Sequence, residues 1–439
     1  MKFLSIVLAA GKGTRLGEKL KLTREVNGIP IIERVVNILK ETNLKTLLIL
    51  GHKKEEVLNI VKEDYVVQEE QKGTAHALMQ AKSFFKEYDY ILVLPGDAPL
   101  IEKEVLVSLI NKHIESKADA TILTTYTNNP KGYGRIVKIN GNFKEIVEEK
   151  NCDDKLKKIK EINSGIYCFN SSSLENNLNK IKQKHEYLLT DIFQIILENG
   201  GLVETLKTSF SFCQGINTLP ELIKASNILR ERKIKYLINK GVEILDPKNS
   251  YIDEKSTIEN GSIIYPNVTI ENSYISTNSC VRGNTRIKNS FIESNVEIES
   301  SLITNSKIKK GTKVGPFAHI RGNSSIDENC RIGNFVEIAR SNVGKEVKIA
   351  HMSYIGDSEI EREVNIGAGV ITCNYDGKNK HKTLIREKAF IGSNSNLIAP
   401  VEIGKKAFIA AGATVTKNVE NELIYISKKE TLIKKREDE

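Results

Sequence analysis

The sequence predicts an α/β domain followed by a parallel β-helix built from six-residue repeats. Two observations predict this order. Apolar runs alternate with amphipathic stretches up to about residue 170, and aliphatic residues recur in steps of six after residue 250. The chain has 439 residues, which is more than one ordinary domain needs. The first pattern indicates a mainly parallel sheet with right-handed crossovers.

Five apolar runs in the first part are expected to be strands, at residues 3–10, 46–50, 65–67, 90–94 and 120–126. A helix is predicted to begin at Pro30, because Pro suits the first turn and Ile31, Ile32, Val35, Ile38 and Leu39 then share one face. Asn140-Gly141 lies between two short apolar runs within residues 135–147. That dipeptide predicts a β-hairpin, which would add antiparallel strands to the sheet.

Aliphatic residues in the second part form three runs with a step of six. The runs are Ile252, Ile258, Ile264 and Ile270, then Leu302, Ile308, Val314, Ile320, Ile326, Ile332 and Ile338, then Ile385, Ile391, Leu397, Ile403, Ile409 and Val415. This step fits neither an α-helix nor a simple strand, but each six-residue side of a triangular coil points one aliphatic side chain inward.

Two slips and one break interrupt the repeat. The register shifts by one residue between Ile270 and Ile275, and again between Ile338 and Val343. Residues 373–384 do not fit the coil and are polar and rich in Lys. We expect this segment to project as a functional loop or an arm between subunits.

Composition excludes several classes of protein. The net charge is +9, but basic and acidic residues are interleaved, which favours attraction of small anions over nucleic-acid binding. No apolar stretch approaches the roughly 20 residues of a membrane span, and residues 1–10 fit a buried strand better than a signal peptide. The six cysteines are far apart, so reduced, mostly buried thiols of a cytosolic protein are expected.

A glycine-containing loop follows the first predicted strand. Gly11 and Gly13 let backbone N–H groups approach phosphate oxygens, and Lys12, Arg15 and Lys21 add positive charge. The spacing differs from both the Walker A loop and the dinucleotide-binding fingerprint. A G-x-G alone is usually a tight turn, but the flanking Leu-Ala-Ala and Thr-Arg make this loop more specific.

Asp97 follows the apolar run at residues 90–94, at the carboxyl end of a strand, where ligands of open α/β sheets bind. A hard cation such as Mg²⁺ prefers few carboxylates together with substrate phosphates. A lone Asp after a strand is more often a turn residue, Asn163 alone fits a strand-end turn, and a lone His such as His351 more often fills a coil corner. The order of these residues along the chain and the intervals between them, taken together, favour a functional role over a purely structural one.

These motifs resemble the signature of the sugar-1-phosphate nucleotidyltransferases. Matching segments follow in order at residues 8–15, 68–77, 95–100, 132–135, 161–165 and 214–217. With the repeats included, the sequence from Phe3 to about Lys428 resembles the bacterial bifunctional N-acetylglucosamine-1-phosphate uridyltransferase/glucosamine-1-phosphate acetyltransferase family.

The resemblance implies a Rossmann-like α/β nucleotidyltransferase domain with a mainly parallel mixed sheet at 1–219 and a helical linker at 220–242. It implies a left-handed parallel β-helix of hexapeptide repeats, with a C-terminal tail, at 243–439. A cytoplasmic homotrimer with acetyl-transfer sites between subunits is the expected assembly.

For the first domain the resemblance implies Mg²⁺-dependent uridylyl transfer from UTP to N-acetylglucosamine 1-phosphate. Arg15 and Lys21 would be catalytic, and Asp97 and Asn217 would hold the metal. The uridine nucleotide would lie against Leu8, Ala9, Ala10, Gly11, Lys21, Gln68, Gly73 and Thr74, and the sugar against Gly134, Glu148, Asn163 and Asn217.

For the second domain the resemblance implies N-acetylation of glucosamine 1-phosphate by acetyl-CoA. His351 would be the base, a role that suits a side chain with a pKa near neutrality. Arg321 and Glu337 would position the phosphate and amine. The other substrate contacts would be Tyr354, Asn365, Asn374 and Tyr375, and acetyl-CoA would lie along Ala368, Ser393, Ala411 and Lys428.

The sequence departs from the family pattern at four positions. Leu20 stands where Pro usually precedes the phosphate-side Lys, and Pro95 stands where an aromatic residue is frequent. Lys428 replaces an Arg that contacts CoA, and Ala339 replaces a Lys that contacts phosphate. The adjacent Arg340 is expected to point to another face of the coil. Losing a charge-assisted contact costs about 1.5–3 kcal/mol, so we predict weaker binding of the amino-sugar phosphate.

Two alternatives stay open at this point. One is a monofunctional sugar-1-phosphate nucleotidyltransferase whose β-helix is only structural, which the changes at Ala339 and Lys428 would permit. The other is a non-catalytic regulatory or scaffold subunit, which predicts loss of Asp97 or of the glycine loop. The sequence retains both features.

Overall fold

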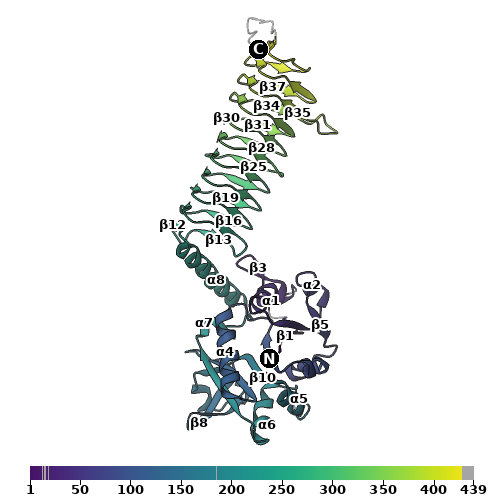
Figure 1. The fold of residues 1–439 in the computed structure, drawn as a ribbon, viewed down its shortest axis with the longest axis vertical. Coiled ribbons are helices and arrows are strands. Elements are labelled where there is room, and N and C mark those ends of the chain that lie inside the picture. Colours follow the sequence, from purple (N-terminus) through teal and green to yellow (C-terminus); the bar gives the residue numbers. More distant parts are fainter. Residues whose placement is uncertain (12, 14–15, 18, 184, 428–439) are drawn as a thin grey trace, which may run out of the picture. The chain divides into compact units, whose positions relative to one another are not determined.

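The computed structural model describes residues 1–427 except 12, 14–15, 18 and 184. The chain divides into two compact units, Met1–Leu229 and Arg230–Glu439, which are coloured purple to teal and teal to yellow in Figure 1. Lys12, Arg15 and Lys428, all singled out from the sequence, lie outside the described residues.

The first unit is built on a nine-stranded mixed sheet. Its main order is β11 (Val203–Thr208), β7 (Ala120–Tyr126), β10 (Glu161–Asn170), β6 (Tyr90–Pro95), β1 (Phe3–Ala9), β4 (Lys45–Leu50) and β5 (Asp64–Val67). β1 pairs in parallel with β4 and β6, whereas β10 is antiparallel to β6 and β7. The five strands expected from the sequence are confirmed.

Helices cover both faces of this sheet. They are α1 (Ile31–Glu41), α2 (Lys54–Leu58), α3 (Thr74–Met79), α4 (Lys103–Ser116), α5 (Ser171–Leu178), α6 (Ile192–Glu198) and α7 (Phe210–Cys213). Side chains alternate along β4, so Leu48 and Leu50 join the core with α1 and α4, while Leu47 and Ile49 join the core with α3, α5 and α6. The predicted helix is confirmed, but it begins at Ile31, one residue after Pro30, and its apolar face is buried.

Two hairpins extend the first unit. β8 (Arg135–Ile139) and β9 (Asn142–Val147) pair antiparallel, and β8 adds to β10. Asn140 and Gly141 have φ angles of 53° and 84°, as a tight turn of the primed type requires. The predicted hairpin is therefore confirmed. A smaller one joins β2 (Glu25–Val26) and β3 (Ile29–Pro30).

Residues of the predicted linker form the helix α8 (Leu219–Asn239). Ala225 and Leu229 are buried in the core of the first unit, and Ile234 and Leu237 are buried in the core of the second. The boundary between the compact units consequently falls inside this helix.

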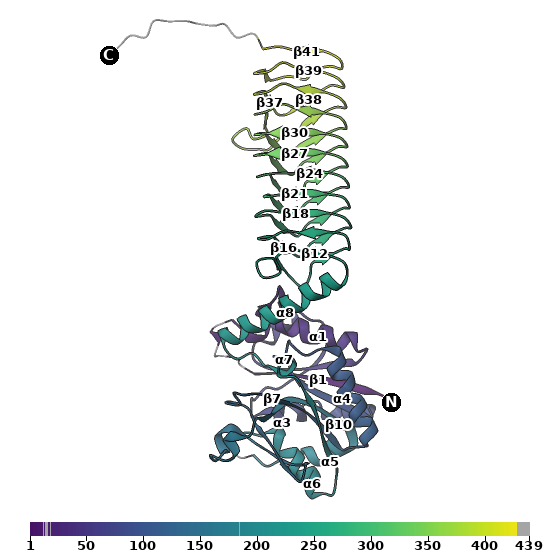
Figure 2. The same cartoon turned by 90° about the vertical axis from the view of Figure 1, so that its left-hand side faces the viewer.

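The second unit is a parallel β-helix, running from β12 (Glu243–Ile244) to β41 (Ile424–Tyr425). Its strands form three parallel sheets of eleven, ten and nine strands, and successive strands in each sheet come from successive coils (Figure 2). The inward aliphatic residues make one continuous core along the coils. Loop residues 374–382 project from this stack between β34 (Ile371–Cys373) and β35 (Thr383–Ile385), as expected (Figure 1).

The repeat register is confirmed with one correction. Ile303, not Leu302, is the inward residue of β22 (Leu302–Thr304), and Leu302 is only half-buried. The side from Ile303 to Ile308 is one residue short, because Asn305 turns the corner at once with a φ of 47°. The register shifts by one residue before Ile275 and before Val343, as the sequence indicates. Both side chains are buried and so point inward.

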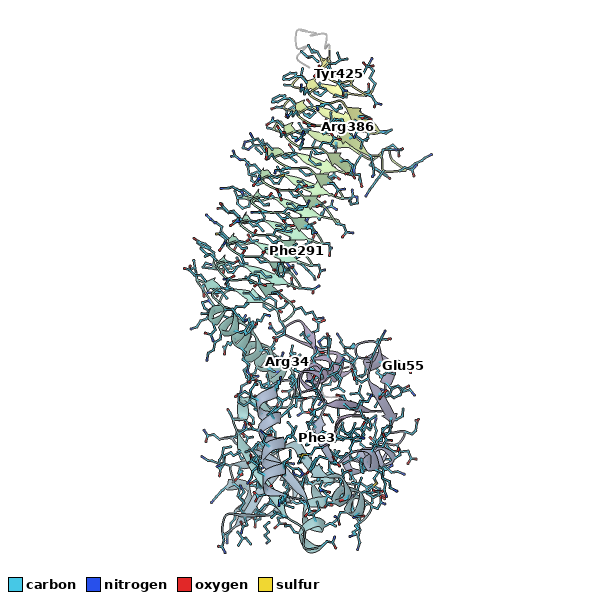
Figure 3. The ribbon with its side chains drawn as sticks, viewed as in Figure 1. Phe3, Arg34, Glu55, Phe291, Arg386 and Tyr425 are labelled. Atoms are coloured by element: carbon cyan, nitrogen blue, oxygen red, sulfur yellow. The ribbon has the colours of Figure 1, made fainter. Side chains whose placement is uncertain are left out.

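Outward and polar side chains also stack from coil to coil. Phe291, labelled in Figure 3, lies on Tyr274 with ring centroids 4.8 Å apart. Buried hydroxyls satisfy backbone groups at the corners; Ser301, for example, donates to Glu299 O at 2.6 Å and accepts from Ala318 N at 3.1 Å.

All six cysteines are free, as expected, and Cys152, Cys168, Cys213 and Cys330 are buried. Within the described part of the chain, no helix combines the length and the apolar character that crossing a membrane requires.

Candidate active sites

A cavity of about 390 Å³ lies at the carboxyl end of β1 in the first unit. It contains every residue that the sequence assigns to the uridine nucleotide, together with Asp97. Its lining also includes Gln71 and Glu186, which the sequence did not single out. Gln71 Nε2 donates to Ala10 O at 2.7 Å and so holds the start of the glycine loop. Gln71 lies inside the motif at residues 68–77, and that position is the signal by which the sequence could have identified it.

A neighbouring cavity of about 530 Å³ shares Leu8, Thr74 and Pro95 with the first. Glu148 and Asn163, both predicted to bind the sugar, line it. A Cβ placed on Gly134 would lie 3.7 Å from Glu148 Oε1 and 3.7 Å from Asn163 Cβ, so this glycine borders the same space. The structure therefore brings the predicted sugar residues together, except Asn217.

Hydrogen bonds fix the two polar side chains of the sugar cavity. Thr190 Oγ1 donates to Glu148 Oε1 at 3.0 Å, and Asn163 Nδ2 donates to the Tyr167 hydroxyl at 2.7 Å. Sequence reasoning missed Thr190 and Tyr167. Thr190 is 42 residues from its partner, and no local motif marks it. Burial raises the pKa of the Tyr167 hydroxyl, which keeps it neutral.

Asn217 lies at a cationic centre beside the nucleotide cavity. Lys21 Nζ forms an ion pair with Asp97 and donates to Asn217 Oδ1 at 3.2 Å. The two predicted metal ligands thus converge on one ammonium group. A carboxylate and an amide oxygen aimed at a common cation suit a hard divalent ion whose other ligands are phosphates and water.

The described residues form no cluster with more metal-binding side chains than this centre. Across the described residues, no group of three or more His, Cys, Asp or Glu side chains is placed to hold a metal ion. The Asp97 carboxylate and the Asn217 amide oxygen therefore stay a predicted pair of metal ligands.

In the second unit, His351 ends β30 (Lys348–His351) and lies one coil above Asn334 of β27 (Arg331–Asn334). His351 Nδ1 and Asn334 Oδ1 are 2.7 Å apart. With the amide oxygen as the acceptor, the imidazole hydrogen would lie on Nδ1 and the lone pair on Nε2. This arrangement fits the base predicted from the sequence.

The predicted acetyl-CoA residues follow His351 along one corner of the β-helix. Gly369 N donates to His351 O at 3.2 Å, and Asn394 N donates to Ala368 O at 2.8 Å. Gly412 N donates to Ser393 O at 2.7 Å, which places Ala411 on the next coil. Ala368, Ser393 and Ala411 therefore form a column of small side chains beside the base. Asn365, at the start of β33 (Asn365–Ile366), pairs in register with Lys348.

Arg321 and Glu337 form a pair on neighbouring coils. They lie on β25 (His319–Arg321) and β28 (Glu337–Ala339), and Arg321 Nε is 2.8 Å from Glu337 Oε1. Ala339, which ends β28, is fully buried. The predicted phosphate and amine contacts are thus held together, with a short side chain beside them.

Arg340 leaves the strand at the corner after Ala339. Its Nε and Nη2 lie 2.7 and 2.8 Å from the two oxygens of Asp357, and Asn374 Nδ2 donates to the same carboxylate. Hydrogen bonding to Arg340 lowers the pKa of Asp357. As expected, the Arg340 side chain points away from the buried Ala339. The Arg340 guanidinium nevertheless contacts Asp357, which accepts from the predicted substrate residue Asn374.

Tyr375 begins the projecting loop and stands apart from this group. Its hydroxyl donates to Gly377 O at 2.7 Å, and its side chain is exposed. Asp376 ties the loop to itself by accepting from His381 Nε2 at 2.7 Å and from the backbone. Asn374 and Lys382, at the two ends of the loop, contact Asp357 and Glu359 of the β-helix, whereas the exposed Tyr375 bonds within the loop.

Comparisons with known proteins match both units. Residues 5–159 match the MobA-like NTP transferase domain, residues 305–340 the bacterial transferase hexapeptide (six repeats), and residues 385–417 the hexapeptide repeat of succinyl-transferase. The bifunctional protein GlmU of Acetivibrio thermocellus is 41% identical over 98% of this chain and 96% of its own length. Those of Clostridium novyi and Clostridioides difficile are 42% and 40% identical over 95% and 99% of this chain and 94% and 97% of their own lengths.

The chain belongs to the GlmU family. It is therefore a bifunctional transferase, with an α/β nucleotidyltransferase unit followed by a left-handed β-helix of hexapeptide repeats that carries acetyl transfer. Its function is the synthesis of UDP-N-acetylglucosamine in two steps. Nucleotide, acyl-CoA and sugar-phosphate substrates and a divalent metal follow from this membership. A purely structural β-helix and a non-catalytic subunit are disfavoured.

Proposed function

We propose that each unit completes one of the two reactions with the residues described above. The β-helix acetylates glucosamine 1-phosphate with acetyl-CoA, and the α/β unit then joins the product to UTP and releases pyrophosphate. The observation that carries this proposal is the presence of two separately assembled sites, the Lys21–Asp97–Asn217 centre and the Asn334–His351 pair.

Uridylyl transfer brings two polyanions together, so the site has to neutralise charge and align the reactants. Lys21 and Arg15 supply positive charge, and backbone N–H groups of the loop from Leu8 to Gly11 approach the phosphates. Asp97 and Asn217 would hold Mg²⁺, and the ion would supply neutralisation of phosphate charge there.

The neighbouring cavity receives N-acetylglucosamine 1-phosphate. Glu148 and Asn163 bind polar groups of the sugar, and Thr190 and Tyr167 keep those two side chains oriented. The cavity's shared wall with the nucleotide site brings the sugar phosphate near the α-phosphate of UTP, as in-line attack requires.

Acetyl transfer begins when His351 Nε2 removes a proton from the ammonium group of glucosamine 1-phosphate. The free amine attacks the thioester carbonyl, a C–N bond forms, and the C–S bond breaks with release of the CoA thiol. Asn334 fixes the tautomer that makes this possible. The column of Ala368, Ser393 and Ala411 leaves room for an extended cofactor.

The assembly is a cytoplasmic homotrimer with acetyl-transfer sites between subunits. The support is the projecting loop, whose Tyr375 has no contact with the other substrate residues of its own chain. A neighbouring subunit would bring this tyrosine to a site. The molar mass in solution tests this arrangement.

The test of the two activities uses purified protein with glucosamine 1-phosphate, acetyl-CoA, UTP and Mg²⁺. Free thiol and pyrophosphate are followed separately. We expect thiol release without UTP, and pyrophosphate release that depends on prior acetylation. Pyrophosphate release from N-acetylglucosamine 1-phosphate with no thiol release in any condition would instead establish a monofunctional nucleotidyltransferase.

A further inference from the structure

Four polar side chains form a connected cluster on the β-helix around Arg340. Its guanidinium binds Asp357 through two nitrogens, Asn374 donates to the same carboxylate, and the Tyr354 hydroxyl is a further hydrogen-bond partner of Arg340. Tyr354 and Asn374 are predicted substrate residues. Arg340 is only partly buried, with 31% of its side chain exposed.

Small residues make the room that this cluster occupies. A Cβ on Gly356 would lie 2.5 Å from the Tyr354 hydroxyl and 2.7 Å from Asn374 Nδ2, and a Cβ on Gly322 would lie 2.9 Å from Arg340 Cγ. Ala339 pairs in register with Gly356. Larger side chains at these positions would displace Tyr354, Asn374 or Arg340, so the conformation of the cluster depends on small neighbours.

Arg340 is also adjacent to Arg321. Arg340 N donates to Arg321 O at 3.2 Å, so the backbones of the two residues lie on neighbouring coils, about 4.8 Å apart. Each guanidinium is anchored at Nε and Nη2 by one carboxylate, Arg321 by Glu337 and Arg340 by Asp357. Each retains further N–H donors, and two such planar donors a coil apart suit the oxygens of a phosphate monoester.

The charge of the cluster favours an anion. The two arginines and two carboxylates balance, and Lys380 of the projecting loop adds a positive charge that acts on Asp357. Ala339, fully buried, contributes no charge. Arg340 at the corner is a cation beside Arg321 that takes the place of the charge missing at Ala339.

We infer that Arg340 binds the phosphate of the amino-sugar phosphate together with Arg321, held in place by Asp357. This inference rests on the proposed acetyltransferase function and deepens it, because it assigns the phosphate contact to a residue outside the family pattern. It also replaces the expectation of weak substrate binding that Ala339 alone suggests.

The test is the KM for glucosamine 1-phosphate in Arg340→Ala and Arg340→Lys proteins. We expect KM to rise about 10- to 100-fold in the alanine variant and less in the lysine variant, which keeps the charge but loses the planar fork. The KM for acetyl-CoA and the release of pyrophosphate by the other unit should not change. An unchanged KM for the sugar phosphate in both variants would overturn the inference.

The inhibition constant for inorganic phosphate distinguishes two roles of Arg340, namely direct contact with the phosphate and positioning of Asn374 alone. If Arg340 touches phosphate, the inhibition constant rises in Arg340→Ala by about the same factor as KM. A raised KM with an unchanged inhibition constant, or wild-type protein that phosphate does not inhibit, contradicts the inference. Absence of thiol release from wild-type protein would instead refute the proposed acetyltransferase function.

Arg286→Ala is the matched control. Arg286 begins β19 (Arg286–Lys288) in the same sheet and binds Glu271 of the neighbouring coil through Nε at 3.0 Å and Nη2 at 2.8 Å. Its loss removes an equivalent pair between coils away from the cluster. The kinetic constants of this variant should equal those of wild type, and a matching rise in KM would show that the effect of Arg340 is structural.

Discussion

The two sites are built in different ways. In the α/β unit, the site residues come from strand ends and loops far apart in sequence, such as Lys21, Asp97 and Asn217, and they line two neighbouring cavities or lie beside them. In the β-helix, His351 and Arg321 stand on the outer surface of a regular stack, and each neighbour lies one coil away. The first site depends on the whole sheet, whereas the second depends on local register. Substitutions should therefore separate the two activities cleanly.

The largest expected effect is on the cationic centre. Asp97→Ala removes the carboxylate paired with Lys21, and we expect pyrophosphate release to fall about 10³-fold or more because the cation that balances phosphate charge loses its carboxylate ligand. Thiol release should be unchanged. Asp64→Ala, which removes an exposed carboxylate paired with Lys45 on the same sheet, is the control. Retention of more than a tenth of the wild-type rate in Asp97→Ala would refute the assignment.

The reverse separation is expected from the β-helix. His351→Ala should lower thiol release about 10²- to 10³-fold, because the substrate ammonium then lacks its base, while pyrophosphate release from supplied N-acetylglucosamine 1-phosphate is retained. His351→Gln should behave alike. If the glutamine variant keeps the wild-type rate of thiol release, another group is the base.

Periodic features of this fold could be predicted well. The buried positions of the coils, the hairpin turn at Asn140 and the start of α1 follow from local spacing and turn chemistry, which one stretch of sequence contains. Leu302 was misplaced because the corner at Asn305 is one residue short, a change that the preceding step of six does not reveal.

Polar contacts between residues far apart in the chain could not be predicted from the sequence. Thr190 holds Glu148, and Asp357 joins Arg340 to Asn374, through contacts that only the folded chain creates. Family motifs identified Glu148 and Asn374 themselves. The residues that orient them carry no spacing signal, because their partners lie on other strands or other coils.

Stability should also differ between the units in acid. His113 of α4 is fully buried and hydrogen-bonded to Thr121, and desolvation lowers its pKa from 6.5 to about 4. Between these values the unfolded chain binds a proton that the folded unit excludes, so the free energy of unfolding should fall by about 3 kcal/mol as the pH drops from 6.5 to 4. The buried polar groups of the β-helix are mostly Ser and Thr hydroxyls, which do not titrate there.

Unfolding of the first unit, followed by loss of pyrophosphate release and by calorimetry, measures this difference. We expect it to unfold before the β-helix at pH 4.5. His113→Gln should reduce the pH dependence, whereas His185→Gln, at an exposed position of the same unit, should leave it unchanged. Equal pH dependence in wild type and His113→Gln would exclude His113 as the cause.

The smallest expected effect tests how the β-helix orients its base. Asn334→Ala removes the acceptor for His351 Nδ1, and a neutral hydrogen bond is worth about 0.5–1.5 kcal/mol, so kcat for thiol release should fall up to about tenfold with KM little changed. Asn342→Ala is matched, since Asn342 also bridges neighbouring coils, to Glu359 at 3.0 Å. If both variants lower kcat equally, Asn334 only stabilises the coil; a fall confined to Asn334→Ala supports a site assembled by coil register.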